Sequence, residues 1–424
     1  MSGPHAPLGL GLVGCGRFGA FCLAAIADLP DAAVVAVTDV DSERASDLAI
    51  AHDARTVRDF ETLIAMAAVD VVIISTPPVT HGPMLRAAAE AGKHVFCEKP
   101  LATDLAAARS ALEASERLGT RVTVDYVMRW NPLYWLLRRL QALQRADGSA
   151  VLGALQRFAL ENLAGDEQLP AGHWFWERDQ SGGIFVEHGV HFFDAAAWLY
   201  ESQPLVIQAL QVVGAAGAVD TVVASSVHPG GGTASYHHAF THPDRGEYQA
   251  ILLDWGFARG QLRGWIPVEL DLESWTDADG ASLLERLLAD PAAALGVPHV
   301  RPSGREAIDL HVTELRNADM WRARDTARRV TQRVEIRATL GGEAAKTAVY
   351  RESVRAGVAD LVEAVRGGRS PAVSGADMYG SLSTAIAAQH AADSGRTRHP
   401  EPVGVRPRCR PTAPVTRQAN RPVA

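Results

Sequence analysis

An α/β fold is predicted for this chain: a doubly wound parallel sheet comes first, followed by an α+β domain with a large, mostly antiparallel open sheet. In the first 125 residues, short apolar runs alternate with helical segments, as in parallel strands joined by right-handed crossovers. Beyond Tyr126, strand-like runs follow one another with turn residues between them. A chain of 424 residues exceeds one ordinary core. We therefore expect domains over 1–125 and 126–395, and a disordered tail rich in Pro and Arg over 396–424.

The elements of the first domain follow from β-branched runs and alanine-rich segments. Continuous apolar runs suit strands that helices cover on both faces. The expected strands are Leu8–Val13, Val34–Asp39, Val69–Ser75, His94–Cys97 and Val122–Asp125. The expected helices are Phe18–Ala27, Glu43–Ala51, Phe60–Ala68, His81–Ala91 and Thr103–Leu118, the last with Thr103 as its N-cap.

The second domain is predicted from strand-like runs separated by turn residues. The expected strands are Val151–Leu160, Leu205–Val213, Thr221–Val227, Thr233–Phe240, Tyr248–Asp254 and Gln261–Pro267. The expected helices are Ile184–Leu199, Ala281–Leu295, Ser353–Val365 and Gly380–Ala392. Because few helices separate these strands, we expect their sheet to be largely antiparallel.

Composition excludes several classes of function. The formal net charge is -8, and no block of basic residues is interleaved with aromatic ones, so nucleic acid and anionic membranes are poor partners. No apolar segment is long enough to span a bilayer, and we see no signal peptide. Four scattered cysteines without a Cys-x-x-Cys pair fit a reducing compartment. We expect a cytoplasmic protein.

A glycine fingerprint predicts a dinucleotide site. Of two overlapping Gly-x-Gly-x-x-Gly frames, the one at Gly14, Gly16 and Gly19 directly follows the first strand, where the backbone can approach a pyrophosphate at a helix N-terminus. Asp39 lies 20 residues beyond Gly19 at the end of the next strand, where an acid can bind both ribose hydroxyls. A carboxylate there repels a 2′-phosphate, so NAD is favoured over NADP. This is the Rossmann arrangement.

A second motif, Glu98-Lys99-Pro100, ends the strand His94–Cys97, so Lys99 would lie at the crevice where α/β sheets bind ligands. Burial and the positive charge of an oxidised nicotinamide ring would both lower the pKa of Lys99 and suit it to proton transfer.

Several separated motifs together resemble the Gfo/Idh/MocA oxidoreductases, the glucose–fructose oxidoreductase and inositol dehydrogenase family. They are the glycine fingerprint, Ser75-Thr76-Pro77-Pro78-Val79-Thr80-His81, Glu98-Lys99-Pro100, Arg129-Trp130-Asn131-Pro132 and the run from Gly182 to Asp194. The resemblance extends from about Leu8 to about Gly395 and is weakest near Thr276–Gln332. It implies a nicotinamide cofactor, substrates that are commonly sugars or cyclitols, and a homodimer or homotetramer formed through the second domain's sheet.

The resemblance also implies roles for individual residues. Lys99 would lie near the reacting carbon, and His191 would be the catalytic histidine. Glu187 stands where the family usually has Asp, four residues before that histidine. The cofactor would contact Gly14, Gly16, Arg17, Phe18, Gly19, Asp39, Thr76, Pro77, His81, Glu98, Lys99 and Arg129.

Glu187, His191 and Asp194 are spaced i, i+4, i+7, so a regular helix would carry them on one face, with Glu187 or Asp194 orienting the imidazole of His191. The alternative is the solvated face of an amphipathic helix, but the stripe contains no Lys or Arg. Trp174 and His188 are weaker candidates for substrate contact. His237 and His238 point to opposite faces of a strand, so we expect no metal site.

These features predict an NAD-dependent dehydrogenase that interconverts a secondary alcohol and a ketone on a small polyol-like substrate, with Lys99 and His191 moving the hydroxyl proton. One alternative is a lyase or glycosidase that oxidises a sugar transiently. Another is a non-enzymatic regulator that senses NAD or a sugar.

Overall fold

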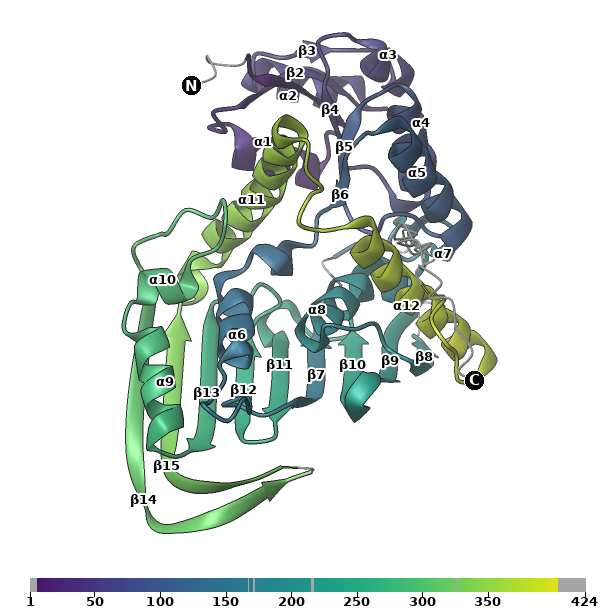
Figure 1. Cartoon of the computed structure of the whole chain (residues 1–424). Helices are drawn as coiled ribbons and strands as arrows, with labels where there is room; N and C mark the ends of the chain where they lie inside the picture. The colour runs from purple at the N-terminus through teal and green to yellow at the C-terminus, as the bar shows by residue number, and fades with distance from the viewer. Residues whose placement is uncertain (1–5, 167, 171, 215–216, 325, 403–424) are drawn as a thin grey trace, which may run out of the picture.

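The computed structural model describes residues 6–166, 168–170, 172–214, 217–324 and 326–402. Within them, two sheets lie one above the other (Figure 1). The upper sheet is parallel throughout, with the strand order β3-β2-β1-β4-β5-β6. Its strands are β1 (Leu8–Val13), β2 (Ala32–Thr38), β3 (Arg55–Thr56), β4 (Val71–Ile74), β5 (His94–Cys97) and β6 (Val122–Val124). This confirms the predicted doubly wound sheet.

Helices cover both faces of the upper sheet, whose central strands are apolar; every residue of β4 is buried. They are α1 (Arg17–Ile26), α2 (Ser42–Ala51), α3 (Phe60–Ala65), α4 (His81–Glu90) and α5 (Leu105–Leu118). The prediction of Thr103 as the cap of α5 is wrong. Asp104 has the extended backbone of an N-cap, and its side chain accepts a 2.8 Å hydrogen bond from the amide of Ala107.

The lower sheet has nine strands in the order β14-β15-β13-β12-β11-β7-β10-β9-β8, and only the β7–β10 pair is parallel within the described residues. The strands are β7 (Leu155–Leu163), β8 (Val206–Val213), β9 (Val219–Val227), β10 (Thr233–Ala239), β11 (Tyr248–Trp255), β12 (Ala258–Arg263), β13 (Glu269–Thr276), β14 (Ala307–Ala323) and β15 (Thr326–Thr339). The mostly antiparallel sheet is confirmed, but two predicted ranges are shifted. The strand expected at Val151–Leu160 begins at Leu155, and the one expected at Gln261–Pro267 is β12.

Helices cover one face of the lower sheet (Figure 1). They are α6 (Pro132–Ala142), α8 (Val190–Tyr200), α9 (Ala278–Leu288), α10 (Pro291–Leu295) and α12 (Gly375–Ser394), whereas the short helix α7 (Arg178–Ser181) contacts η1 (Pro78–Thr80) of the upper domain. The other face exposes charged side chains such as Arg259 and Arg337 and, near its β8 edge, apolar ones such as Leu210 and Val223.

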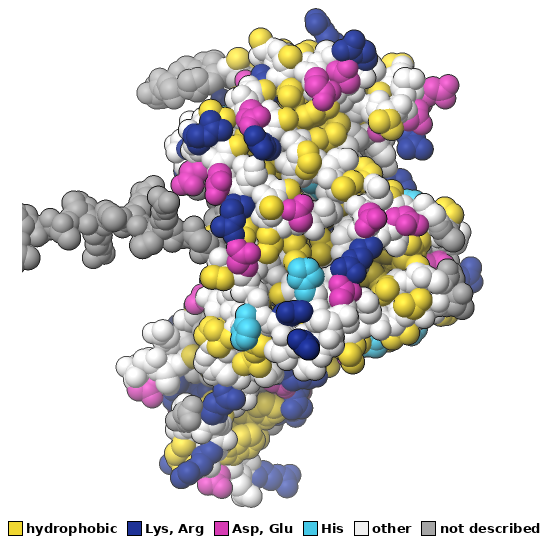
Figure 2. Space-filling model, turned by 90° about the vertical axis from the view of Figure 1, so that its right-hand side faces the viewer, with side chains coloured by type: hydrophobic (Ala, Val, Ile, Leu, Met, Phe, Trp, Pro, Cys, Tyr) yellow, Lys and Arg dark blue, Asp and Glu magenta, His cyan; other side chains and the backbone are white. Residues whose placement is uncertain are grey.

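The β14–β15 hairpin is the lowest part of the molecule in Figures 1 and 2, and its side chains mix Lys or Arg with hydrophobic residues. Its strands were not predicted. Exposed residues occupy most of β14, so it lacks the apolar alternation that marks a half-buried strand. Near the hairpin's tip, Arg324 donates a 2.9 Å hydrogen bond to the carbonyl of Gly230.

The helix α11 (Lys346–Gly367) follows the lower sheet in the sequence but packs against α1 of the upper domain. Tyr350 of α11 lies 4.7 Å, ring to ring, from Phe21 of α1. An added Cβ at Gly357 would lie 3.2 Å from the ring of Phe96, so the helix approaches β5 closely.

The predicted disordered tail falls partly outside the described residues, which end at residue 402. Its proposed start at residue 396 is too early. The backbone groups of Arg398 form an antiparallel bridge with Ile207, and Glu401 accepts a hydrogen bond from Tyr379.

Candidate active site

The glycine loop between β1 and α1 is built for a close approach of backbone or ligand. Gly14 has φ +93°, and an added Cβ there would lie 2.1 Å from the carbonyl oxygen of Ser75. At Gly19 a Cβ would lie 2.1 Å from the oxygen of Gly14. Gly16, the N-cap of α1, would meet nothing within 4 Å and caps no amide with a side chain. The loop is thus held tightly on the protein side and open at the helix N-terminus, as an anionic pyrophosphate requires.

Asp39 is fixed at the end of β2 beside this loop. Its carboxylate accepts hydrogen bonds from the amides of Cys15 at 2.5 Å and Asp41 at 2.8 Å. The open helix N-terminus and this anchored acid fit a dinucleotide, with the ribose hydroxyls as partners of Asp39. Arg17 and Phe18 begin α1, and the ring of Phe18 lies 6.5 Å from that of Tyr350.

His81 joins two loops of the groove from behind. Its Nδ1 lies 2.7 Å from the oxygen of Pro100 and its Nε2 2.7 Å from the oxygen of Thr76. Burial lowers the pKa of His81. Each ring nitrogen faces a backbone carbonyl, and the neutral imidazole donates to one of the two, so His81 supports the loops at Thr76–Pro77 and Lys99–Pro100.

Lys99 reaches across to the second domain. Its ammonium group donates to the carboxylate of Glu187 and, at 3.0 Å, to the carbonyl oxygen of the same residue. Both side chains are largely buried, with 11% and 8% of their surface exposed. Burial lowers the pKa of Lys99, but the carboxylates of Glu187 and Glu98 outweigh it, and the pKa is raised. The expected lowering is therefore wrong for the protein alone, because the ion pair with Glu187 joins residues 88 positions apart and no local motif reveals it.

Two further acids lie behind Lys99. Glu98 accepts a hydrogen bond from the amide of Lys99, and burial raises its pKa to about 7. Asp125, which directly follows β6, is 1% exposed, and its Oδ1 has no hydrogen-bond partner among the described residues. Burial and Glu98 raise the pKa of Asp125 as well. Asp125 was not predicted as a site residue, although an acid at the end of the neighbouring parallel strand was a usable signal.

The segment that carries Glu187 is a turn of π-helix, η3 (Phe185–Gly189), which runs into α8. In a regular α-helix, Glu187, His191 and Asp194 would share one face. The wider π-helical turn changes which of these side chains converge. Glu187 points to Lys99, whereas Asp194 binds Arg129 with two hydrogen bonds of 2.8 Å. The structure therefore does not bring Asp194 to His191, and neither Glu187 nor Asp194 is hydrogen-bonded to that imidazole in the described part of the chain.

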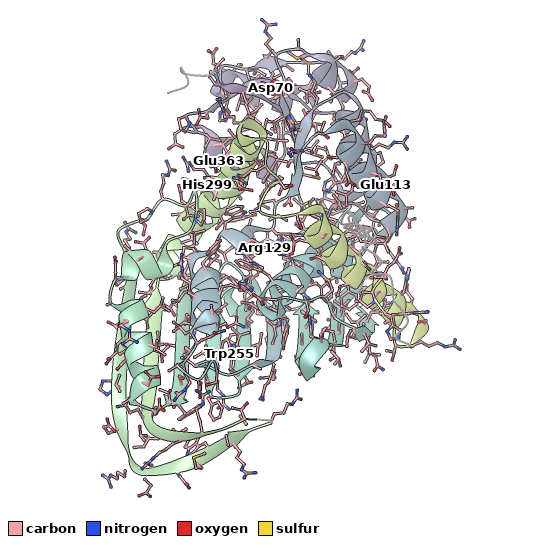
Figure 3. All side chains as sticks on the ribbon, viewed as in Figure 1. Asp70, Glu113, Arg129, Trp255, His299 and Glu363 are labelled. Atoms are coloured by element: carbon pink, nitrogen blue, oxygen red, sulfur yellow. The ribbon has the colours of Figure 1, made fainter. Side chains whose placement is uncertain are left out.

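Arg129 lies between the two domains (Figure 3). Besides Asp194, its guanidinium donates at 2.9 Å to Asp377 of α12, and Ser381 donates at 3.0 Å to Asp194. The guanidinium also stacks over Trp198 at 5.3 Å. Arg129 therefore ties η2 (Val127–Trp130) to α8 and α12. Its Nε and one terminal nitrogen are used in hydrogen bonds to the carboxylates of Asp194 and Asp377.

His191 lies in α8 with its Nδ1 buried and without a partner among the described residues. Burial and the charge of Lys99 lower its pKa well below the ordinary value, so the imidazole is neutral near pH 7. The ring of Trp265 lies 6.1 Å from that of His191 and 5.2 Å from that of Tyr350. These two aromatic residues were not predicted, since they lie far along the chain from every motif.

The weaker candidates lie beside this group. His188 packs 5.3 Å from the rings of His238 and Phe240, and burial lowers its pKa to about 3. Trp174 packs on His173 and Phe175, and Phe175 in turn packs on Phe240. Both therefore belong to an aromatic cluster next to His191. Over the described residues, no group of His, Cys, Asp or Glu could hold a metal ion. No helix there is long and apolar enough to cross a membrane.

Both family comparisons match this architecture. The model described as an oxidoreductase family with an NAD-binding Rossmann fold matches residues 8–126, and that of the GFO/IDH/MocA C-terminal domain matches residues 140–252.

Among curated proteins, the chain is 29% identical over 218 residues to inositol 2-dehydrogenase of Rhizobium meliloti (strain 1021). The aligned residues cover 50% of this chain and 62% of that protein. It is 29% identical over 287 residues to D-apiose dehydrogenase of Paraburkholderia graminis, covering 66% of this chain and 67% of the relative. The alignments thus span about two thirds of these relatives.

Among solved structures, the WlbA dehydrogenase of Bordetella pertussis, in complex with NADH and UDP-GlcNAcA, has a TM-score of 0.69 at 21% identity over 94% of this chain and 99% of that one. A levoglucosan dehydrogenase in complex with NADH and L-sorbose has a TM-score of 0.69 at 18% identity over 94% of this chain and 100% of that one. At these identities the likeness establishes the fold. With both domains matched, the chain belongs to the Gfo/Idh/MocA family of oxidoreductases and carries its NAD-binding Rossmann fold.

Proposed function

We propose that the protein is an NAD-dependent dehydrogenase that interconverts a secondary alcohol and a ketone on a sugar, a cyclitol or a related polyol. The observation that carries this proposal is the juxtaposition of Lys99, bound to Glu187 across the domains, with the neutral imidazole of His191. This pairs a cation with a base at the carboxyl edge of a dinucleotide-binding sheet. The relatives named inositol 2-dehydrogenase and D-apiose dehydrogenase support the substrate class.

The charge states of Lys99 and His191 suit the two residues to different roles. Bound NAD would supply a hydride acceptor. The ammonium group of Lys99 donates a hydrogen bond to the substrate oxygen and stabilises the negative charge that develops there. His191 holds the position of the base, because its imidazole is neutral and its Nδ1 has no partner among the described residues. Glu187 keeps Lys99 charged and aimed.

The surroundings of His191 suit a polyol. Trp265 lies next to His191 and Tyr350 next to Trp265, and sugar rings stack on aromatic side chains of this kind. Asp39 favours NAD, since its carboxylate would repel the 2′-phosphate of NADP. We also infer that the open face of the nine-stranded sheet joins copies of the chain in a homodimer or homotetramer, because it exposes Leu210, Val212 and Val223.

The test measures NADH formation with a panel of cyclitols, aldoses and their derivatives, using the wild type, Lys99→Ala and His191→Ala. We expect turnover on at least one polyol and a loss of about 10²–10⁴-fold in each variant, the usual contribution of one acid–base group. Lys346→Ala is the matched control, since this lysine is paired with Glu343 on the surface. Equal turnover by Lys99→Ala and wild type would contradict the mechanism.

A further inference from the structure

The acids beside Lys99 outnumber the cations that balance them. The ammonium group of Lys99 is already paired with Glu187. The carboxyl groups of Glu98 and Asp125 interact with this same ammonium group and with each other. If all three acids were ionised, the buried group would carry excess negative charge, which a low dielectric disfavours.

Glu98 and Asp125 are neighbours by sheet register. Cys97 of β5 pairs with Val124 of β6, and the amide of Asp125 donates a 2.9 Å hydrogen bond to the oxygen of Cys97. The residue after each strand is therefore at the same level of the sheet. Asp125 is 1% exposed, and its Oδ1 receives no hydrogen bond from the described residues, so this oxygen adds nothing to the stability of the ionised form. Two such acids titrate as a pair that can share one proton.

Other ionisable groups surround the pair from several elements. They are Cys22 of α1, His81 of α4, Cys97 of β5, Lys99, Glu187 of η3, His191 of α8 and Tyr350 of α11. Burial raises the pKa of both cysteine thiols and of the Tyr350 phenol, so these groups stay protonated near pH 7. Burial keeps the two imidazoles neutral. Proton exchange near neutral pH is therefore left to the carboxyl pair, whose Glu98 has a pKa of about 7.

The pair lies at the nicotinamide half of the cofactor groove. In this strand order, a dinucleotide would bind at the β1–β4 switch point, with Asp39 at the end of β2 as the partner of its adenosine ribose. Its nicotinamide half would then be held on the side of β4, β5 and β6, where Glu98 and Asp125 follow their strands. The nicotinamide ring is a cation in NAD⁺ and is uncharged in NADH, so the two forms of the cofactor act differently on a nearby carboxyl pair.

We propose that Glu98 and Asp125 form a proton-sharing carboxyl pair that senses the oxidation state of the cofactor. The pair holds a proton in the free protein and in the NADH complex, and it releases that proton to solvent when NAD⁺ binds. The one covalent bond that breaks in this step is the O–H bond of the carboxyl pair, and its proton passes to solvent. The site gains the positive charge of the nicotinamide ring and loses the positive charge of the proton, so its net charge is unchanged. This inference rests on the proposed NAD site.

A cation placed within about 4 to 6 Å lowers the pKa of a carboxyl group by about 1 to 3 pH units. NAD⁺ binding should therefore tighten as the pH rises, by up to about tenfold per pH unit below the pKa of the pair, and then level off. NADH binding should lack this dependence, so low pH shifts the preference of the site toward the reduced cofactor.

The test is titration calorimetry of the full chain with NAD⁺ and with NADH, near pH 7, in two buffers of different ionisation enthalpy. We expect wild-type protein to release between about one half and one proton per NAD⁺ and close to none per NADH. Asp125→Asn and Glu98→Gln should each abolish the release, with folding checked by circular dichroism. Glu113→Gln, an exposed acid on α5 with the same change of charge, should behave as wild type (Figure 3).

Three outcomes are decisive against the idea. Equal proton release with NAD⁺ and NADH would overturn it. So would undiminished release by folded Asp125→Asn, because the proton would then come from Lys99 or another group. If neither cofactor binds the wild type, the proposed function itself fails along with the inference that rests on it.

Discussion

Removal of the buried ion pair between Arg129 and Asp194 should unfold this protein more readily and should leave the chemistry of Lys99 in place. The Arg129 side chain is 9% exposed and that of Asp194 is fully buried. Truncating one partner of such a pair costs about 3 to 5 kcal/mol, because the other charge stays buried without its counterion.

The surroundings set the order of the two variants within that range. In Asp194→Ala, Arg129 keeps its 2.9 Å hydrogen bond to Asp377, so we expect a loss near 3 kcal/mol. In Arg129→Met, Asp194 keeps only the 3.0 Å hydrogen bond from Ser381 among its described partners, so we expect a loss near 5 kcal/mol. Arg129→Met combined with Asp194→Leu should recover part of that loss, since it removes both charges.

Urea unfolding followed by tryptophan fluorescence measures these losses, and Trp198, stacked on Arg129, is a local reporter. The control is Arg157→Met, which removes a partly exposed partner of Asp254 and should cost less than about 1 kcal/mol. The reasoning would be refuted by an Asp194→Ala protein with wild-type stability and no activity. Asp194 would then be catalytic, as its spacing from Glu187 and His191 suggests.

Two other changes test the glycine loop and a helix cap. Gly16→Ala should fold normally, because no atom lies within 4 Å of the added Cβ, and should weaken NAD binding. Gly19→Ala should lower the unfolding midpoint, because its Cβ would lie 2.1 Å from the oxygen of Gly14. Calorimetry measures the change in NAD binding, and thermal melting measures the change in stability. Asp277 caps α9 and binds Arg145, whose hydrogen bonds hold the pKa of Asp277 below its ordinary value. Its contribution to stability is therefore present above the pKa of the unfolded chain and is lost as the pH falls through the folded pKa. Asp277→Asn should consequently lose less stability between pH 5 and pH 2 than wild type in urea melts, and an identical loss would contradict this assignment.

The parts of the fold that the sequence predicted are those with strong local patterns. The strand at His94–Cys97 is correct to the residue, because the three apolar residues after His94 are followed by a charged pair and a proline. The strands β14 and β15 escaped prediction, since exposed residues occupy most of β14 and charged residues separate the buried positions of β15. The π-helical turn at Phe185–Gly189 also escaped, because it requires no special side chain.

The same distinction applies to the site. Lys99 and His191 were found from motifs, and their position at a strand end or on a helix follows from local sequence. The partner of Lys99 proved to be Glu187, and the aromatic neighbour of His191, Trp265, comes from the β12–β13 loop and packs in turn on Tyr350 of α11. Contacts of this kind depend on how two domains pack, which no spacing in one sequence encodes.

The position of α11 has a consequence for the order in which the chain can fold during synthesis. This helix covers α1 and β5, with Tyr350 on Phe21 and Gly357 against Phe96. Arg366 adds hydrogen bonds to the carbonyls of Ala6 and Asp31. A ribosome-bound chain that has emerged only as far as β6 thus lacks this helix, and the apolar surface around Phe21 and Phe96 that α11 covers is exposed to other nascent chains. The sheet whose last strand ends at Val124 therefore completes its packing only after residue 367 has left the exit tunnel.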